Sequence, residues 1–187
     1  MAAYSLPVEA AGVLEAADGD GAVPRSTFFA EIAPALGISV PVAELEAAYR
    51  HDYVRYYAPD PRVTDAVTRL RGAGWTTAIV TNGPPTQIDK IALVGLTDLF
   101  DTVVVSEVEH VRKPDPAIFE LVGARTGVAL EGGWMVGDHP ENDIVGAHDV
   151  GLHTIWIDRG RTWDPALPAP DVVVADIPAA VAVLLAT

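Results

Sequence analysis

The pattern of apolar and polar positions changes near residue 57. Before this point, apolar residues recur every three or four positions, as in the stripe through Phe28 and Ile32 and the stripe through Leu45, Ala48 and Tyr49. Residues with this spacing share one face of an α-helix. The first part of the chain is therefore predicted to be helical.

Beyond residue 61, predicted strands and helices alternate. A helix is expected at residues 62–71, ended by Gly72 and Gly74. Short apolar runs then predict strands at residues 76–80, 102–105, 134–136, 154–157 and 172–174. Helical stretches near residues 85–93, 116–126 and 141–150 separate the first four strands.

This alternation predicts right-handed crossovers and a parallel sheet with helices on both faces. The expected fold class is α/β. We expect a Rossmann-like parallel sheet in residues 61–187, preceded by a helical subdomain in residues 1–60.

Composition narrows the class of protein. The 187 residues include 12 basic and 26 acidic side chains, which give a formal net charge of −14. A field of this sign repels nucleic acid and anionic membranes, so we expect neither as a partner. The chain has no cysteine, which excludes disulfides and thiolate metal sites. It shows no basic leader and no run of roughly 18 apolar residues, so a cytoplasmic protein is expected.

Residues suited to phosphate binding follow the first two predicted strands. Thr81, Asn82 and Gly83 come directly after the first. A hydroxyl at a strand end, followed by backbone N–H groups that open into a helix, can hold a phosphate oxygen; an ordinary Asn-Gly turn is the other interpretation. Lys113 lies on the loop after the second strand, next to Pro114. It can neutralise phosphate charge, or it can be a surface lysine beside a helix cap.

Two carboxylates follow the third strand. Asp138 ends the apolar run, and Asp143 stands five positions later, across a loop that contains Pro140. Such a pair can face one hard cation, since Mg²⁺ commonly binds one or two carboxylates with waters and substrate phosphate. A helix cap would explain one of the two aspartates. Because ligands bind beyond the carboxyl ends of parallel strands, all three segments fall on the functional edge of the predicted sheet.

In this order, the three segments resemble the haloacid dehalogenase (HAD) superfamily of hydrolases, in the phosphatase branch with a helical cap. The resemblance covers about residues 62–159. It implies that Thr81 binds the transferring phosphoryl group, with backbone donors at Asn82 and Gly83. It also implies that Lys113 stabilises the charge of the nucleophile and the phosphate.

The same resemblance implies a cofactor and a class of substrate. Asp138 would hold Mg²⁺, with Asp143 as its support. The substrate would be a small phosphorylated metabolite enclosed by the cap.

One element of the family is not supplied in a convincing form. The family's reaction begins at an apolar first strand that ends in Asp-x-Asp-Gly-Thr; its first aspartate attacks phosphorus, and its second acts as general acid and base. The textual match here includes Asp18 and Asp20. The residues before it do not form a strand pattern, and Ala22 replaces the expected Thr or Ser. We interpret the match as a polar turn ahead of a helix.

Without this first strand, the centre of the predicted sheet would be open. The family places the strand between those at residues 76–80 and 134–136, so its absence would leave a gap of roughly 9–10 Å, or two strand spacings. An N-terminal segment, an element swapped from a second copy in a homodimer, or residues of a longer native protein could fill it.

The leading hypothesis is a HAD-type, Mg²⁺-dependent phosphatase. The alternative is a catalytically inactive relative that binds phosphate or metal, or that serves as a scaffold.

Overall fold

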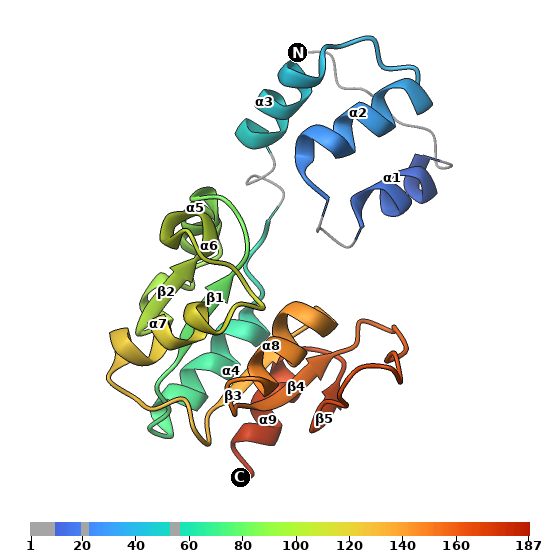
Figure 1. Ribbon diagram of the computed structural model, residues 1–187. Coiled ribbons are helices and arrows are strands. Elements are labelled where there is room, and N and C mark those ends of the chain that lie inside the picture. The colour runs from blue at the N-terminus through green and yellow to red at the C-terminus, as the bar shows by residue number, and fades with distance from the viewer. Residues whose placement is uncertain (1–9, 20–22, 53–56) are drawn as a thin grey trace. The chain divides into compact units, whose positions relative to one another are not determined.

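The computed structural model describes residues 10–19, 23–52 and 57–187 (Figure 1). The chain divides into two compact units, Met1–Tyr56 and Tyr57–Thr187. Asp20, Gly21 and Ala22, which belong to the textual motif match, lie outside the described residues. Within the described part, every helix is too short or too polar to cross a membrane.

The first unit is helical, as its apolar pattern predicts. It contains α1 (Ala10–Asp18), α2 (Arg25–Ala35) and α3 (Val42–Asp52). The rings of Phe29 and Tyr49 pack edge to face in its core, with centroids 5.7 Å apart. Asp18 is the last residue of α1 and not a loop residue, so the expected turn begins at Gly19, where φ is 55°. The Asp18 carboxylate pairs with Arg25 at 2.6 Å.

The second unit alternates strands and helices. Its elements are α4 (Pro61–Gly72), β1 (Ala78–Thr81), α5 (Thr86–Leu93), η2 (Thr97–Leu99), β2 (Thr102–Val105), α6 (Ser106–Glu109), α7 (Pro116–Thr126), β3 (Trp134–Gly137), the π-helical turn η3 (Pro140–Val145), α8 (Gly146–His148), β4 (His153–Ile157), β5 (Val172–Val174) and α9 (Ile177–Leu184). The predicted bounds of β2, β5 and α7 are confirmed. β1 starts two residues later than predicted because its partner β2 begins only at Thr102, which pairs with Ala78.

Aspartates followed by proline begin two of these helices. Asp60 accepts a hydrogen bond from the backbone N–H of Arg62 at the start of α4, and Asp115 accepts one from Ala117 at the start of α7. Each proline occupies the first helical position, where its missing N–H has no helical partner to lose. The chain therefore enters α7 at a fixed angle, and this orients the loop that carries Lys113.

The strands form two parallel sheets in the described part of the chain. One has the order β1-β2 and the other the order β3-β4-β5. The α/β class with parallel strands is confirmed. The break between the sheets lies between β1 and β3, where the sequence led us to expect an open centre.

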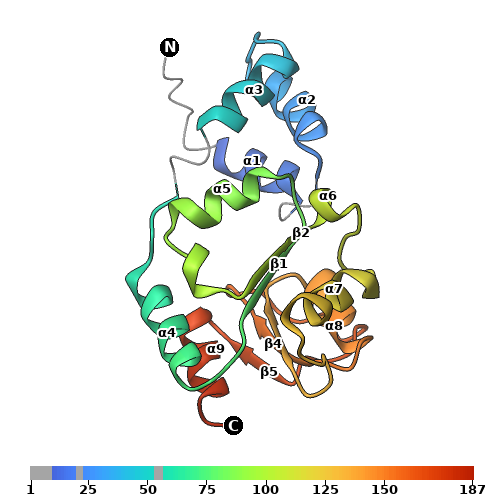
Figure 2. The ribbon, with the colours of Figure 1, turned by 90° about the vertical axis from the view of Figure 1, so that its left-hand side faces the viewer.

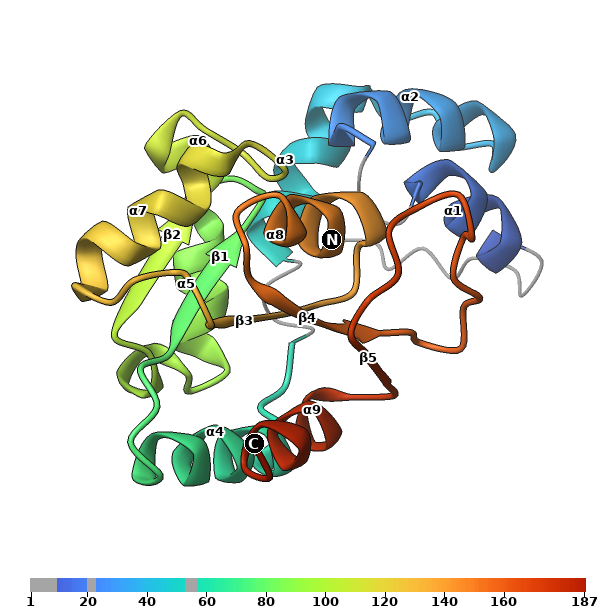
Figure 3. The same ribbon diagram turned by 60° about the horizontal axis from the view of Figure 1, so that its bottom comes forward.

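Helices cover both faces of the strands, as predicted. Figures 2 and 3 show α4 and α9 side by side on one face, with α7 and α8 on the other. Ile155 of β4 packs with Leu70 and Ala180 on the α4–α9 side. Val80 of β1 and Met135 of β3 pack on the opposite side. Both sheets therefore belong to one layer held between shared helices.

Candidate active site

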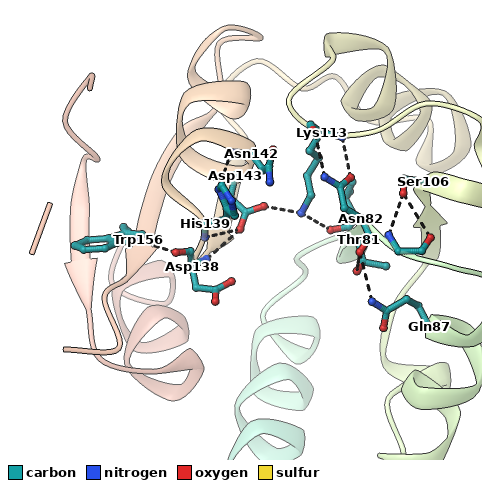
Figure 4. A network of polar contacts seen from close by, with 12 residues as sticks. Thr81, Asn82, Gln87, Ser106, Lys113, Asp138, His139, Asn142, Asp143 and Trp156 are labelled. Carbon is teal, nitrogen blue, oxygen red and sulfur yellow. Dashed lines mark hydrogen bonds and ion pairs between the residues drawn. The ribbon is translucent and has the colours of Figure 1, made fainter. Parts of the chain in front are cut away.

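Lys113 joins the two sheets at their carboxyl ends. Its side chain is buried, and the residue is only 7% exposed. The ammonium Nζ donates to the carbonyl oxygen of Val80 in β1 at 2.8 Å and to Asp143 Oδ1 at 2.5 Å (Figure 4). The alternative of a solvated surface lysine is therefore wrong.

Asn82 holds the backbone of Lys113 in place. Its amide Nδ2 donates to the Lys113 carbonyl and its Oδ1 accepts from the Lys113 N–H, both at 2.9 Å. The N–H of Gly83 donates to Ser106 Oγ at 3.0 Å. This segment therefore does more than turn the chain, because it fixes the Lys113 loop against β1. Ser106 was not predicted, although its position directly after β2 places it on the same edge.

Thr81 ends β1 with a weakly held hydroxyl. Its Oγ1 donates to the carbonyl of Asn82 at 3.4 Å, a long contact that a better acceptor can replace. Gly83 has a φ of 155°, and a Cβ there would approach Gln87 Nε2 to 2.6 Å. A side chain at Gly83 would therefore disturb the turn that follows Thr81.

Asp143 organises the loop after β3. It is 4% exposed, and its Oδ2 accepts from the backbone N–H groups of Asp138 and His139, both at 3.0 Å. A Cβ on Gly137 would collide with this carboxylate, so the close approach requires glycine. His139 accepts from the N–H of Asn142 through Nδ1 at 3.2 Å, which makes His139 a cap of the π-helical turn.

Asp138 lies beside two arginines that the sequence did not single out. Its Oδ2 is 3.1 Å from Arg159 Nη2 and 3.8 Å from Arg161 Nη2. Its backbone carbonyl accepts from Arg161 at 2.6 Å and from Trp156 Nε1 at 3.0 Å. A sequence signal was present, since both arginines follow β4 and so fall on the same carboxyl edge.

The carboxylates offer a limited set of metal ligands. No cluster of three or more His, Cys, Asp or Glu suited to a metal occurs among the described residues. Both oxygens of Asp143 have protein partners. Within the same part of the chain, no hydrogen bond reaches Asp138 Oδ1, and this side chain is 34% exposed. One open carboxylate suits Mg²⁺, which keeps several waters and takes further oxygens from a phosphate.

Comparison with known proteins agrees with this geometry. The sequence model of the haloacid dehalogenase-like hydrolases matches residues 13–151. A phosphoserine phosphatase of Thermus thermophilus is 35% identical over 124 residues, which are 66% of this chain and 50% of that protein. A glyceraldehyde 3-phosphate phosphatase of Pyrococcus furiosus is 36% identical over 115 residues, 61% of this chain and 48% of that protein. The matched region thus spans about half the length of these relatives.

Solved structures show the same fold. The HAD-hydrolase YfnB of Bacillus subtilis, bound to magnesium, superposes with a TM-score of 0.84 at 22% identity, over 97% of this chain and 85% of that one. A HAD phosphatase of Thermococcus onnurineus gives a TM-score of 0.65 at 26% identity, over 94% and 80% of the two chains. On the matched sequence and the shared fold, the chain belongs to the haloacid dehalogenase-like hydrolase family.

Proposed function

We propose that this chain is a Mg²⁺-dependent phosphatase that acts on a small phosphate monoester. The observation that carries the proposal is the buried Lys113 ammonium, which lies between the carboxyl ends of β1 and β3 and contacts both. A buried cation at the functional edge of a parallel sheet provides the local positive charge that an anionic substrate needs in a protein with a net charge of −14.

Each residue of the edge has a distinct role in this proposal. Thr81 donates its hydroxyl to a phosphate oxygen, and the backbone around Asn82 and Gly83 shapes the same pocket. Lys113 stabilises the negative charge that develops during phosphoryl transfer, because it acts in a site shielded from water. Asp138 holds the Mg²⁺, and Asp143 supports it by fixing the Asp138 N–H and the Lys113 ammonium.

The metal would supply electrostatic chemistry. Mg²⁺, when bound, neutralises phosphate charge and polarises the phosphoryl group. Asp138 is suited to this task because one of its oxygens is open while the other is held by Arg159. Arg161 and Trp156 fix the backbone carbonyl of Asp138, so its carboxylate is presented from a rigid strand end.

The first unit is proposed to serve as the substrate-selecting cap of a cytoplasmic enzyme. The relatives are named for phosphoserine and glyceraldehyde 3-phosphate, which are small phosphate monoesters. A substrate of this class is proposed here. Association of two copies stays a prediction.

Hydrolysis of p-nitrophenyl phosphate by the full chain tests the proposal. We expect turnover that requires Mg²⁺ and that falls by roughly 10²–10³-fold in Asp138→Asn, since one preorganised charged group is lost. Asp18→Ala is the matched control, because it removes a carboxylate of the first unit that pairs with Arg25. We expect its turnover to match that of the parent.

Two results would contradict this account. Equal turnover in the parent and in Asp138→Asn would show that hydrolysis does not use this edge. A large loss in Asp18→Ala would overturn our interpretation of the Asp18 segment as a turn. Binding of Mg²⁺ and phosphate without turnover would favour the inactive relative.

A further inference from the structure

A slot separates the two sheets where a single continuous sheet would carry one more strand. A cavity of about 880 Å³ runs between β1 and β3. Its walls are apolar side chains of the covering helices, such as Phe119 of α7, Leu70 of α4 and Val181 of α9. Figure 3 shows β1 and β3 in the same layer, with helices on either side.

β1 and β3 run in the same direction. Their carboxyl ends are joined through Lys113, which contacts Val80 and Asp143. At the opposite ends, Trp75 before β1 and Trp134 at the start of β3 pack against the same apolar cluster. A segment placed between the two strands would therefore be parallel to both.

The facing edges of the two strands carry backbone groups without a strand partner in the described part of the chain. The N–H and the C=O of Thr77 point toward the β2 side, where both bond to Asp101. By alternation along the strand, Ala78 and Val80 present their backbone groups to the slot.

The same alternation applies to β3. The C=O of Gly133 bonds to the N–H of His153, at the start of β4. Trp134 and Val136 then present their backbone groups to the slot. Buried N–H and C=O groups are costly to leave unpaired, so the slot offers two rows of hydrogen-bonding groups.

Burial marks the same vacancy. All residues of β1 and β3 are half-buried, whereas Val104 in β2 and Ile155 in β4 are fully buried. In a continuous parallel sheet the middle strands are the most buried, because helices cover both faces. The inverted order indicates that a neighbour belongs between β1 and β3.

We propose that the slot is a docking site for one extended peptide strand from a separate chain, apolar along its length and carrying a carboxylate at its carboxyl end. The apolar body follows from the walls. The carboxylate follows from charge, because Lys113, Arg159 and Arg161 face only Asp138 and Asp143 at that end, which leaves one positive charge.

Residues 1–9 of this chain fit the slot less well. Pro7 has no N–H to donate, and proline is avoided in central strands. The only carboxylate of this segment is Glu9, directly before α1. A second copy offers the same residues, and its own described strands are already paired.

Amide exchange measured by NMR on the full chain tests the docking site, with the probe peptide Ac-Lys-Lys-Val-Ile-Val-Val-Asp-Gly-NH₂. We expect saturable one-to-one binding that slows exchange at Ala78, Val80, Trp134 and Val136 by about tenfold or more. Ile79 and Met135 face the existing sheets and serve as internal controls, with unchanged exchange.

Two matched peptides sharpen the test. Replacing Asp by Asn should weaken binding by about tenfold, because a charge-assisted contact is lost. Replacing the second valine by proline should abolish binding, because a ladder N–H is removed.

The inference fails under two results. If the four slot-facing amides are already as protected as Ile79 and Met135 in the free protein, residues 1–9 or a second copy fill the slot. If the valine and proline peptides bind alike, the contact is not a strand pairing. Neither measurement uses substrate or metal, so the result is independent of the proposed phosphatase activity.

Discussion

Lys113 and Asp143 form an ion pair with almost no access to water. Their side chains are 9% and 6% exposed, and Nζ lies 2.5 Å from Oδ1. Removing one partner of a buried pair leaves the other charge without compensation, and this costs more than the pair itself contributes. The pair is therefore a structural constraint on the edge as well as a proposed part of its chemistry.

We expect Lys113→Met to lower the free energy of unfolding by about 3–5 kcal/mol. Asp143→Asn should also destabilise, and the double variant should lose at least about 1 kcal/mol less than the sum of the two single losses, since the residues interact directly. Urea unfolding measures all three values. Lys90→Met is the matched control, because Lys90 lies over the Tyr57 ring and should cost about 1 kcal/mol or less. Strictly additive losses would contradict the pairing.

At the residue scale, motif positions were predictable and their partners were not. Thr81, Lys113 and Asp138 stand beside strand ends, which a hydrophobic pattern locates. Arg159 and Ser106 reach the site through loops after other strands. Their contacts depend on the packing of β4 and α6, which no local spacing encodes.

A polar junction ties α4, β1 and η2 together at the edge opposite the site. Asp101 accepts from Arg71 Nη1 at 2.7 Å and from the Thr77 N–H at 2.8 Å. Thr77 Oγ1 donates to the Leu99 carbonyl at 2.9 Å. The hydrogen bond from Arg71, followed by that from the Thr77 backbone, lowers the pKa of Asp101 below its ordinary value of 3.8. This junction sets where β1 and β2 begin.

The sign of this pKa shift predicts a pH dependence. A depressed carboxyl pKa contributes stability above the ordinary value of 3.8, and this contribution is lost as the pH falls through the lowered value. Asp101→Asn should therefore be less stable than the parent near pH 7, by roughly 1–2 kcal/mol from the loss of hydrogen bonds to a charged group. The difference should shrink below pH 3.8.

Urea unfolding between pH 2 and pH 7 checks this expectation. Asp98→Asn is the control, since Asp98 is exposed in the adjacent turn η2 and should unfold like the parent at each pH. A difference between Asp101→Asn and the parent that stays constant across the range would show that the junction does not titrate in this way.

Elements were largely predictable because their signals are local. Asp-Pro pairs mark the starts of α4 and α7, and apolar runs mark the strands. The helix expected near residues 141–150 is instead a π-helical turn followed by the short α8. His139 and Asp143 hold its first turn through backbone contacts, which the apolar pattern does not report.

At the scale of the whole molecule, the strand layer is interrupted where its most buried strand would lie. The flanking strands keep their direction because α4, α7 and α9 cover both sheets, and because Lys113 joins their carboxyl ends. The predicted parallel class and the order of the strands follow from alternating segments. The width of the slot and the exposure of its edges could be seen only in three dimensions.

The central claim is that the carboxyl edge of β1 and β3 binds Mg²⁺ together with a phosphate. Calorimetric titration of the full chain with Mg²⁺, in the presence of inorganic phosphate, tests it most directly. We predict saturable binding that weakens by about tenfold or more in Asp138→Asn, because the one open carboxylate is lost. Asp149→Asn, at an exposed position in the same unit, should bind as the parent does. Equal affinity in the parent and in Asp138→Asn would contradict the account.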